Sequence, residues 1–299
     1  MIPPVVSRPA LLAVCAGSAL AFTRLLQAAT PDPAPATPPA PAQPVVPTQL
    51  VLQNGRAVPI SAVSMQKDQF LVKTDTDNFM AGASIPVSSV DHVVGDKPAA
   101  INQAVALLLT GKSKDARKLL APVLAEHADT AKLPGTFWLE AARAVLVTDG
   151  LDGFAGPCAA LGKEISEATP DSGPDPFVAL GKALLQPATA KVTEREAALR
   201  EVISDDMPDD LCAYASFFLA ELLRNDRRKD AALDTYLAVP CLYPSGGIVV
   251  NGMAQLRAAE ILTAQGSRDE ALALVHSAIR NSKGTVAAEL AAKLLESIK

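Results

Sequence analysis

Beyond Pro98 the apolar residues recur with the spacing of helices that bury one face. The first stripe of this kind consists of Ile101, Ala104, Val105, Leu108 and Leu109. It ends at Gly111, and after a short Gly-Lys-Ser turn a second stripe is formed by Ala116, Leu119, Leu120, Val123 and Leu124. Two helical stripes joined by so short a turn predict an antiparallel helical hairpin.

Breaks between paired helices recur along the rest of the chain. They are expected at Gly111, Gly150, Asn225–Arg227 and Gly266. Their spacing is about 39 residues, with one double-length gap, so a further turn is expected near residue 189. The segment Gln186–Ala190, which contains Pro187, provides that turn. A repeated hairpin predicts a solenoid, because each hairpin buries its open face only by stacking on the next.

We therefore predict a mainly α fold for residues 98–299, with about five helical hairpins. A single helix at Thr285–Ile298 is expected to cap the stack. Ala271, Val275 and Ala278 repeat the second-helix stripe shortly before this cap.

Residues 48–97 carry a different pattern, in which short apolar runs alternate with polar turns. Strands are predicted at Gln49–Leu52, Arg56–Ile60, Ala62–Met65, Gln69–Lys73, Ile85–Val87 and Val90–Val94. Asn54-Gly55 between the first two runs is a strong hairpin signal. Short strands bury little area in a flat sheet, so a small curled barrel or half-barrel is expected. This layout resembles a small SH3-like or Sm-like barrel.

The first 30 residues predict an export signal. Arg8 precedes an uncharged apolar run from Pro9 to Thr23, which is shorter than the roughly 20 residues that cross a bilayer. A cleaved signal peptide is favoured over an N-terminal anchor, with cleavage after Ala21 or Ala29. Lipidation of Cys15 is the less favoured alternative. Residues 31–47 are rich in Pro and Ala, and such a composition predicts an extended linker.

Composition and charge narrow the range of functions. Apolar residues make up 49% of the chain but aromatic residues only 4%, as expected for helices rich in Ala and Leu. The net charge is −5 and the pI is near 5.3, with Lys and Arg scattered along the chain. Such a chain lacks the basic field that nucleic-acid binding requires. We expect no nucleic-acid partner, and membrane contact only through an uncleaved N-terminal segment.

Candidate catalytic and metal-binding residues are sparse. The chain has three His residues, and none has a second His or Cys at metal-ligand spacing. Asp91-His92 is the one acid–base pair, and because neighbours on a strand point to opposite faces, we expect Asp91 not to orient His92. The acidic run Ser204–Asp210 could form a weak calcium site, but helix capping is favoured. We predict no enzyme, cofactor or metal.

Three cysteines follow the N-terminal segment, at widely spaced positions. Cys158, Cys212 and Cys241 fit neither a disulfide framework nor a zinc site. The favoured interpretation is that all three pack as small apolar residues inside helices. The alternative is a single disulfide between two of them.

The predicted hairpins resemble the tetratricopeptide repeat. The matching positions in the first hairpin are Ala104, Gly111, Ala116, Leu120 and Val123. Those in the fourth are Leu219, Ala220, Leu223, Ala232, Tyr236, Val239 and Pro244. Those in the fifth are Ala258, Ala259, Leu262, Gly266, Ala271, Val275 and Ala278.

Several features depart from the tetratricopeptide pattern. The spacing exceeds the family's repeat of about 34 residues. The family's large first-helix aromatic is missing, and Arg143 stands where a small residue is expected. These departures leave the curvature of the solenoid open.

The resemblance implies a non-catalytic protein–protein interaction scaffold. The run Tyr236–Pro244 is similar to repeat ends in exported bacterial tetratricopeptide proteins, which implies a place in the periplasm or cell envelope. The alternative is an accessory ligand- or glycan-binding protein, or a non-catalytic relative of an envelope enzyme. Sugar-binding faces favour several exposed aromatic residues, and the one Trp and three Tyr all lie outside residues 48–97.

The resemblance also implies a binding groove lined by the first helix of each hairpin. Its partner-facing positions map onto Tyr214, Phe217, Glu221, Arg224, Asn225, Met253, Leu256, Glu260 and Thr263. An apolar floor with alternating charges would anchor a peptide and set its register. The alternative is that Tyr214, Phe217, Met253 and Leu256 pack against neighbouring helices.

Overall fold

The computed structural model describes residues 46–131, 133, 136–168, 173–187 and 189–298. The predicted signal at residues 1–30, Cys15 within it, and all but the last two residues of the predicted linker lie outside the described residues.

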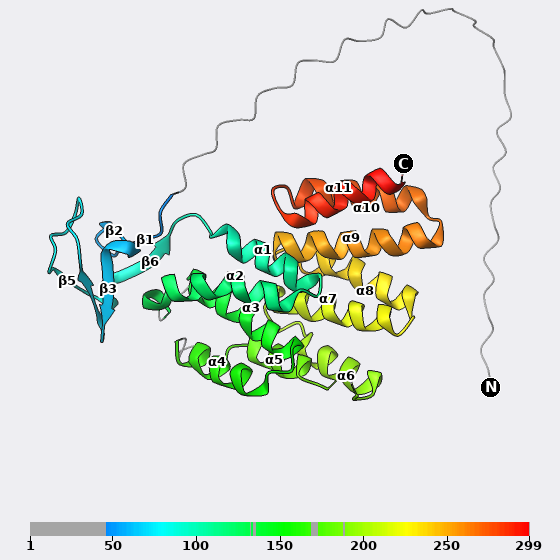
Figure 1. Ribbon diagram of the computed structural model, residues 1–299, viewed down its shortest axis with the longest axis horizontal. Coiled ribbons are helices and arrows are strands. Elements are labelled where there is room, and N and C mark those ends of the chain that lie inside the picture. Colours follow the sequence, from blue (N-terminus) through cyan, green and yellow to red (C-terminus); the bar gives the residue numbers. More distant parts are fainter. Residues whose placement is uncertain (1–45, 132, 134–135, 169–172, 188, 299) are drawn as a thin grey trace, which may run out of the picture. The chain divides into compact units, whose positions relative to one another are not determined.

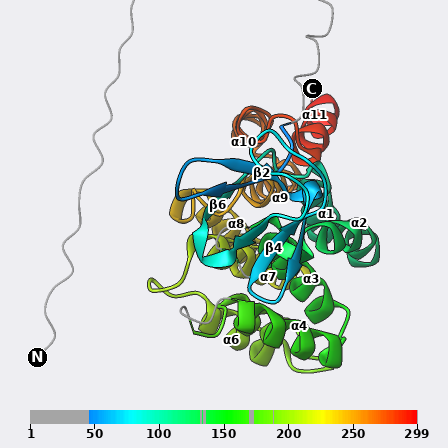
Figure 2. The same ribbon diagram turned by 90° about the vertical axis from the view of Figure 1, so that its left-hand side faces the viewer.

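The N-terminal part of the described chain is a small β region, whose strands are visible in Figure 2. Its strands are β1 (Gln49–Leu52), β2 (Ala57–Pro59), β3 (Val63–Gln66), β4 (Gln69–Val72), β5 (Ser84–Pro86) and β6 (Val90–Val94). They form two three-stranded antiparallel sheets, with strand orders β2-β1-β6 and β3-β4-β5. The core between them contains Leu50, Val58 and Phe70, each fully buried. Leu133, from the helical part of the chain, completes this core.

The predicted hairpin at Asn54-Gly55 is confirmed. β1 and β2 pair across it, and Gly55 adopts φ +78°, a conformation that glycine tolerates best. Three predicted strands extend too far, because Ile60–Ala62 and Val87–Ser89 form short 3₁₀ helices η1 and η2. They are the strands predicted at Arg56–Ile60, Ala62–Met65 and Ile85–Val87. These tight turns end the strands and redirect the chain.

The remaining elements are helices arranged as successive antiparallel pairs (Figure 1). The pairs are α1 (Ala99–Leu109) with α2 (Ser113–Glu126), α3 (Phe137–Leu151) with α4 (Ala155–Ala168), α5 (Phe177–Leu184) with α6 (Val192–Val202), α7 (Asp209–Asn225) with α8 (Lys229–Leu242), and α9 (Ile248–Gln265) with α10 (Arg268–Asn281). The last helix is α11 (Val286–Ile298). Within the described residues, the predicted TPR-like solenoid of five hairpins and a capping helix is confirmed.

Small residues at the repeat positions allow the paired helices to approach closely. Ala104, Ala220, Ala232 and Ala258 are fully buried, as is the larger residue Tyr236. Side chains fill the space between these helices at high density. A substitution that changes the volume at such a position therefore displaces the residues around it.

The turn predicted at Gly150 is wrong. Gly150 lies inside α3 and is buried, and the turn to α4 is made at Gly153, whose φ is +74°. Gly150 is small because α5 crosses there: a Cβ on it would lie 2.7 Å from the carbonyl oxygen of Gly181. The residue that suggested a helix break is therefore a helix–helix contact.

The first helices of the five hairpins, α1, α3, α5, α7 and α9, form an inner row that closes on itself. Each contacts the next, and α9 also contacts α1, so the fifth hairpin meets the first. The capping helix α11 contacts both α9 and α1. The curvature that the sequence left open is thus tight enough for five repeats to complete a ring of inner helices. Figure 2 shows these helices seen roughly along their axes.

The three cysteines in the described part of the chain are unpaired thiols. Cys158 and Cys212 are buried inside helices as expected, whereas Cys241 near the end of α8 is exposed. The prediction of buried packing therefore holds for two of the three. No described helix has both the length and the apolar character to cross a bilayer.

Candidate functional site

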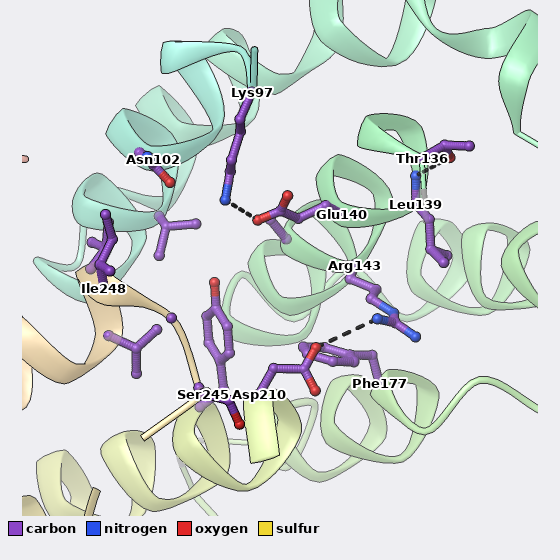
Figure 3. A pocket seen from close by; sticks show the side chains of 17 residues that line it. Lys97, Asn102, Thr136, Leu139, Glu140, Arg143, Phe177, Asp210, Ser245 and Ile248 are labelled. Atoms are coloured by element: carbon purple, nitrogen blue, oxygen red, sulfur yellow. Dashed lines mark hydrogen bonds and ion pairs between the residues drawn. The ribbon is translucent and has the colours of Figure 1, made fainter. Parts of the chain in front are cut away.

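A pocket of about 330 Å³ lies where all five inner helices meet (Figure 3). It is lined mainly by residues from the first two turns of α1, α3, α5, α7 and α9, together with the loop before α9. Its polar lining residues are Lys97, Asn102, Thr136, Glu140, Arg143, Asp210, Tyr214 and Ser245. Its apolar lining residues include Val105, Leu139, Phe177, Ile248 and Val249. Because every repeat contributes, the pocket exists only in the closed ring.

Two carboxylates enter the pocket from helix starts. Glu140 lies in the first turn of α3 and Asp210 in the first turn of α7, where the helix dipole favours negative charge. The ammonium group of Lys97, just before α1, is paired with Glu140. This ion pair links the segment before the first hairpin to the second.

Arg143 holds one wall of the pocket in place. Its guanidinium donates from Nε and Nη2 to Oδ2 of Asp175, over 3.0 Å and 2.7 Å. Asp175 is almost fully buried, and its Oδ1 accepts the amide of Phe177 at the start of α5. The guanidinium also lies over the Phe177 ring at 4.9 Å, a cation–π contact. Two N–H donors aimed at one carboxylate oxygen, from a planar group stacked on an aromatic ring, require Arg rather than Lys.

Tyr214 on α7 forms the aromatic part of the lining. Its ring packs edge-on against Phe177, with centroids 5.7 Å apart. Burial, followed by the nearby carboxylates of Glu140 and Asp210, raises the pKa of the Tyr214 hydroxyl well above its ordinary value. The hydroxyl is therefore neutral throughout the physiological pH range and available as a hydrogen-bond donor.

The loop Ser245–Gly247 forms the rim of the pocket. A Cβ on Gly246 would come within 2.3 Å of the Ala213 side chain, so the loop backbone lies directly on α7. The Ser245 hydroxyl is hydrogen-bonded to Asp209. Beside this anchored loop, Ile248 is a large apolar residue that is 50% exposed.

Of the residues predicted to bind a partner, Tyr214 lies in the pocket. Phe217, Met253 and Leu256 do not face solvent, since each is at most 3% exposed and belongs to the helical core. Phe217 packs edge-on against Tyr236 with centroids 5.6 Å apart. For these three the alternative of packing between helices is correct, because the close approach of α7, α8 and α9 leaves no groove over them.

Glu221, Arg224 and Glu260 lie together, but in an ion-pair network separate from the pocket lining. Glu221 accepts from Arg224 over 2.7 Å and from the Tyr236 hydroxyl over 2.6 Å. Arg257 reaches both Glu221, at 3.1 Å, and Glu260, at 3.0 Å. The network joins α7, α8 and α9, and its groups are largely paired with one another.

The last two predicted residues lie at helix ends. Asn225 is the final residue of α7, and Thr263 lies in the last turn of α9; both are exposed. The Thr263 hydroxyl donates to the carbonyl of Ala259 over 2.8 Å. A role for either residue in partner binding stays a prediction.

Most of the residues that line the pocket are not predicted by the sequence. Lys97, Glu140 and Asp210 lie in three different segments, and no pattern along the chain connects them. Arg143 did give a signal, because it departed from the small residue that the repeat expects. In the structure Arg143 lines the pocket.

The Asp91-His92 pair corrects one expectation. Asp91 Oδ2 and His92 Nδ1 are 2.8 Å apart, although strand neighbours ordinarily point to opposite faces. The β1–β6 register shifts between Val51 and Leu52, and such a bulge can bring successive side chains to one side. Both side chains are more than half exposed. The contact between Asp91 and His92 therefore lies on the surface of the β region.

The last two residues of the acidic run, Asp209 and Asp210, are the first residues of α7 and form hydrogen bonds there. Asp210 Oδ1 accepts the amide of Leu211, and Asp209 is hydrogen-bonded to Ser245. Within the described residues, no group of three or more His, Cys, Asp or Glu could hold a metal ion.

No protein-family model matches the chain, and no curated protein matches it. Among solved structures, two are similar: a crystal structure of the nearly identical TPR-like repeats of a protein assigned as a Podosopora anserina kinesin light chain, and a single-substitution variant of it. Both are 16% identical with a TM-score of 0.31, and cover 61% of this chain and 93% and 92% of theirs. The fold class follows from the helical hairpins themselves.

Proposed function

We propose that the chain is a non-catalytic interaction scaffold whose inner pocket binds a segment of a protein partner. The observation that carries the proposal is the convergence of all five inner helices on one pocket, at whose rim Ile248 is exposed. A closed ring of this kind holds side chains from five distant segments in fixed positions.

The dimensions and chemistry of the pocket suit an extended segment. A volume of about 330 Å³ is at the lower end of ligand pockets, enough for one long or two short side chains but too small for a helix. Apolar residues of the lining would remove a side chain from water, while the charged groups around them would select and orient it.

We place this scaffold in the bacterial periplasm or cell envelope. Support comes from residues 1–30, whose charge and apolar pattern fits an export signal, and from the Pro-rich residues 31–47, whose composition suits a spacer. The run Tyr236–Pro244 adds its similarity to exported repeat proteins.

Site-specific photocrosslinking in the native host tests the proposal. A photoreactive phenylalanine analogue would replace Ile248 at the rim of the pocket. The matched control is Leu151, an exposed apolar residue at the far end of α3. We expect a discrete crosslinked product from position 248 that is absent from position 151.

The amount of crosslinked product at position 248 should also depend on the residues that line the pocket. Tyr214→Phe keeps the ring that packs on Phe177 and removes only the hydroxyl, so it should reduce the yield at position 248 without unfolding the chain. Equal products from both positions, or no product at position 248, would contradict the proposed function.

A further inference from the structure

We propose that the pocket selects a cationic side chain, Lys or Arg, or a free α-amine of its partner, and seats it between the carboxylates of Glu140 and Asp210 and the hydroxyl of Tyr214. This inference rests on the proposed function and adds to it the chemical class of the ligand.

The charges around the pocket do not cancel. Arg143 is paired with Asp175 through two short hydrogen bonds, and Lys97 is paired with Glu140. Asp210 has only a 3.5 Å contact between its Oδ2 and Nη1 of Arg143, which is too long for a strong hydrogen bond. Two cationic side chains therefore face three carboxylates, and the side chains around the pocket carry one excess negative charge.

Some hydrogen-bond acceptors in the pocket remain available to a guest. Glu140 uses Oε1 for Lys97, and Asp210 uses Oδ1 for the amide of Leu211. In the part of the chain that the structure describes, Oε2 of Glu140 and the Tyr214 hydroxyl have no hydrogen-bond partner. An ammonium or guanidinium group offers three to five N–H donors, which matches these acceptors.

The existing cations are held away from a guest. The guanidinium of Arg143 is occupied by Asp175 and by the Phe177 ring, and the ammonium of Lys97 by Glu140. An anionic guest would have to displace one of these partners and would meet the Asp210 carboxylate. The raised pKa of Tyr214 agrees with this, since both pocket carboxylates contribute to it after burial.

The apolar lining suits the rest of such a side chain. Long cationic residues pack their methylene stems on apolar surface while the charged end stays with polar partners. Val105, Leu139 and Val249 line the pocket, and Ile248 is exposed at its rim. The preferred guest is therefore a basic residue with apolar neighbours.

Blocked pentapeptides of sequence Ala-Leu-X-Leu-Ala, with acetyl and amide ends, are suitable probes. X is Arg, Lys, citrulline or Glu; citrulline keeps the shape of Arg without its charge. A version with X as Leu and a free amino terminus tests the α-amine. Binding to the full chain can be followed by the emission of Trp138, the single tryptophan of the chain, which is buried beside the pocket residue Leu139.

We expect the Arg and Lys probes to bind at least about fivefold more tightly than citrulline, and the Glu probe to bind most weakly. Asp210→Asn should remove most of the preference for charge and leave citrulline unaffected. The matched control is Asp206→Asn, an exposed carboxylate in the preceding loop that does not line the pocket. Added salt should weaken only the cationic probes.

Equal affinity for Arg and citrulline, preference for Glu, or no binding of any probe would each overturn the inference. A Glu preference would instead indicate that an anion binds at the start of α9, which in the described structure has no acidic residue in its first turn. These outcomes leave the crosslinking test of the proposed function standing, because that test does not depend on the charge of the partner. Absence of both crosslinks and probe binding would remove the proposed function as well.

Discussion

Gly150 of α3 lies directly against the backbone of Gly181 in α5. A Cβ on Gly150 would lie 2.7 Å from the Gly181 carbonyl oxygen and 2.9 Å from Cβ of Leu184. The second and third inner helices therefore meet at a distance that only glycine permits. This contact is one of those that close the inner row around the pocket.

Gly150→Ala is expected to lower the free energy of unfolding by about 1–2 kcal/mol, because the clash outweighs the better helix propensity of Ala. Gly156→Ala is the matched control: Gly156 is exposed in α4, and no atom lies within 4 Å of a Cβ placed on it. That control should be neutral or stabilising. Urea denaturation of both variants checks the prediction, and equal stability of the two would contradict the close contact.

Tyr236→Phe should cost about 1 kcal/mol of unfolding free energy. The variant keeps the buried ring and removes the hydroxyl that donates to Glu221 over 2.6 Å. Glu221→Gln should cost more, since it removes the charge of the less exposed of the two carboxylates that Arg224 and Arg257 share. The matched comparison is Glu260→Gln, at the more exposed edge of the network, with a smaller expected effect. A larger loss from Glu260→Gln than from Glu221→Gln would show that the network is centred elsewhere.

Stability is expected to fall at alkaline pH. Burial raises the pKa values of Tyr214 and Tyr236, so the folded chain keeps both protonated while the unfolded chain ionises them near pH 10. Their contribution is thus fully present below about pH 10 and is lost above it, at about 1.4 kcal/mol per pH unit for each tyrosine. Urea denaturation between about pH 9 and 11 measures the slope. Tyr214→Phe should make it shallower, and an unchanged slope would contradict the buried environment of Tyr214.

The pattern of apolar positions was sufficient to predict the elements of the fold. Stripes such as Ile101 to Leu109 mark one buried face, and Asn54-Gly55 marks a turn, because both signals are local. Gly150 misled because a glycine at a helix contact and a glycine at a helix break look alike in sequence. The difference depends on α5, which lies some thirty residues further on.

The candidate site was predicted much less well than the fold. Tyr214 was assigned to the binding surface and lines the pocket, but Phe217 and Met253 were assigned to it and are core residues. The reason is the curvature of the ring, which decides whether an inner-helix residue faces a groove or a neighbouring helix. That curvature arises from contacts between distant segments, such as α1 with α9, which no local pattern reports.

Export can be tested apart from binding. Residues 1–30 fused to a reporter that is active only outside the cytoplasm should produce activity, because an uncharged apolar run after a basic residue engages the secretion machinery. The matched control replaces Leu11 and Leu12 with Arg, which interrupts the run and should silence the reporter. An inactive fusion, with the full-length chain found in the cytosol, would contradict the proposed location.

The central claim is that the ring of inner helices holds the partner, and hydrogen exchange on the complex tests it most directly. With the crosslinked partner identified and added to the full chain, amides in the first turns of α3, α7 and α9 and in Ser245–Gly247 should exchange more slowly. The outer helices α2, α4, α6, α8 and α10 and the β region should be unchanged. Protection confined to the β region or the outer helices, with no change around Tyr214 and Ile248, would contradict the account.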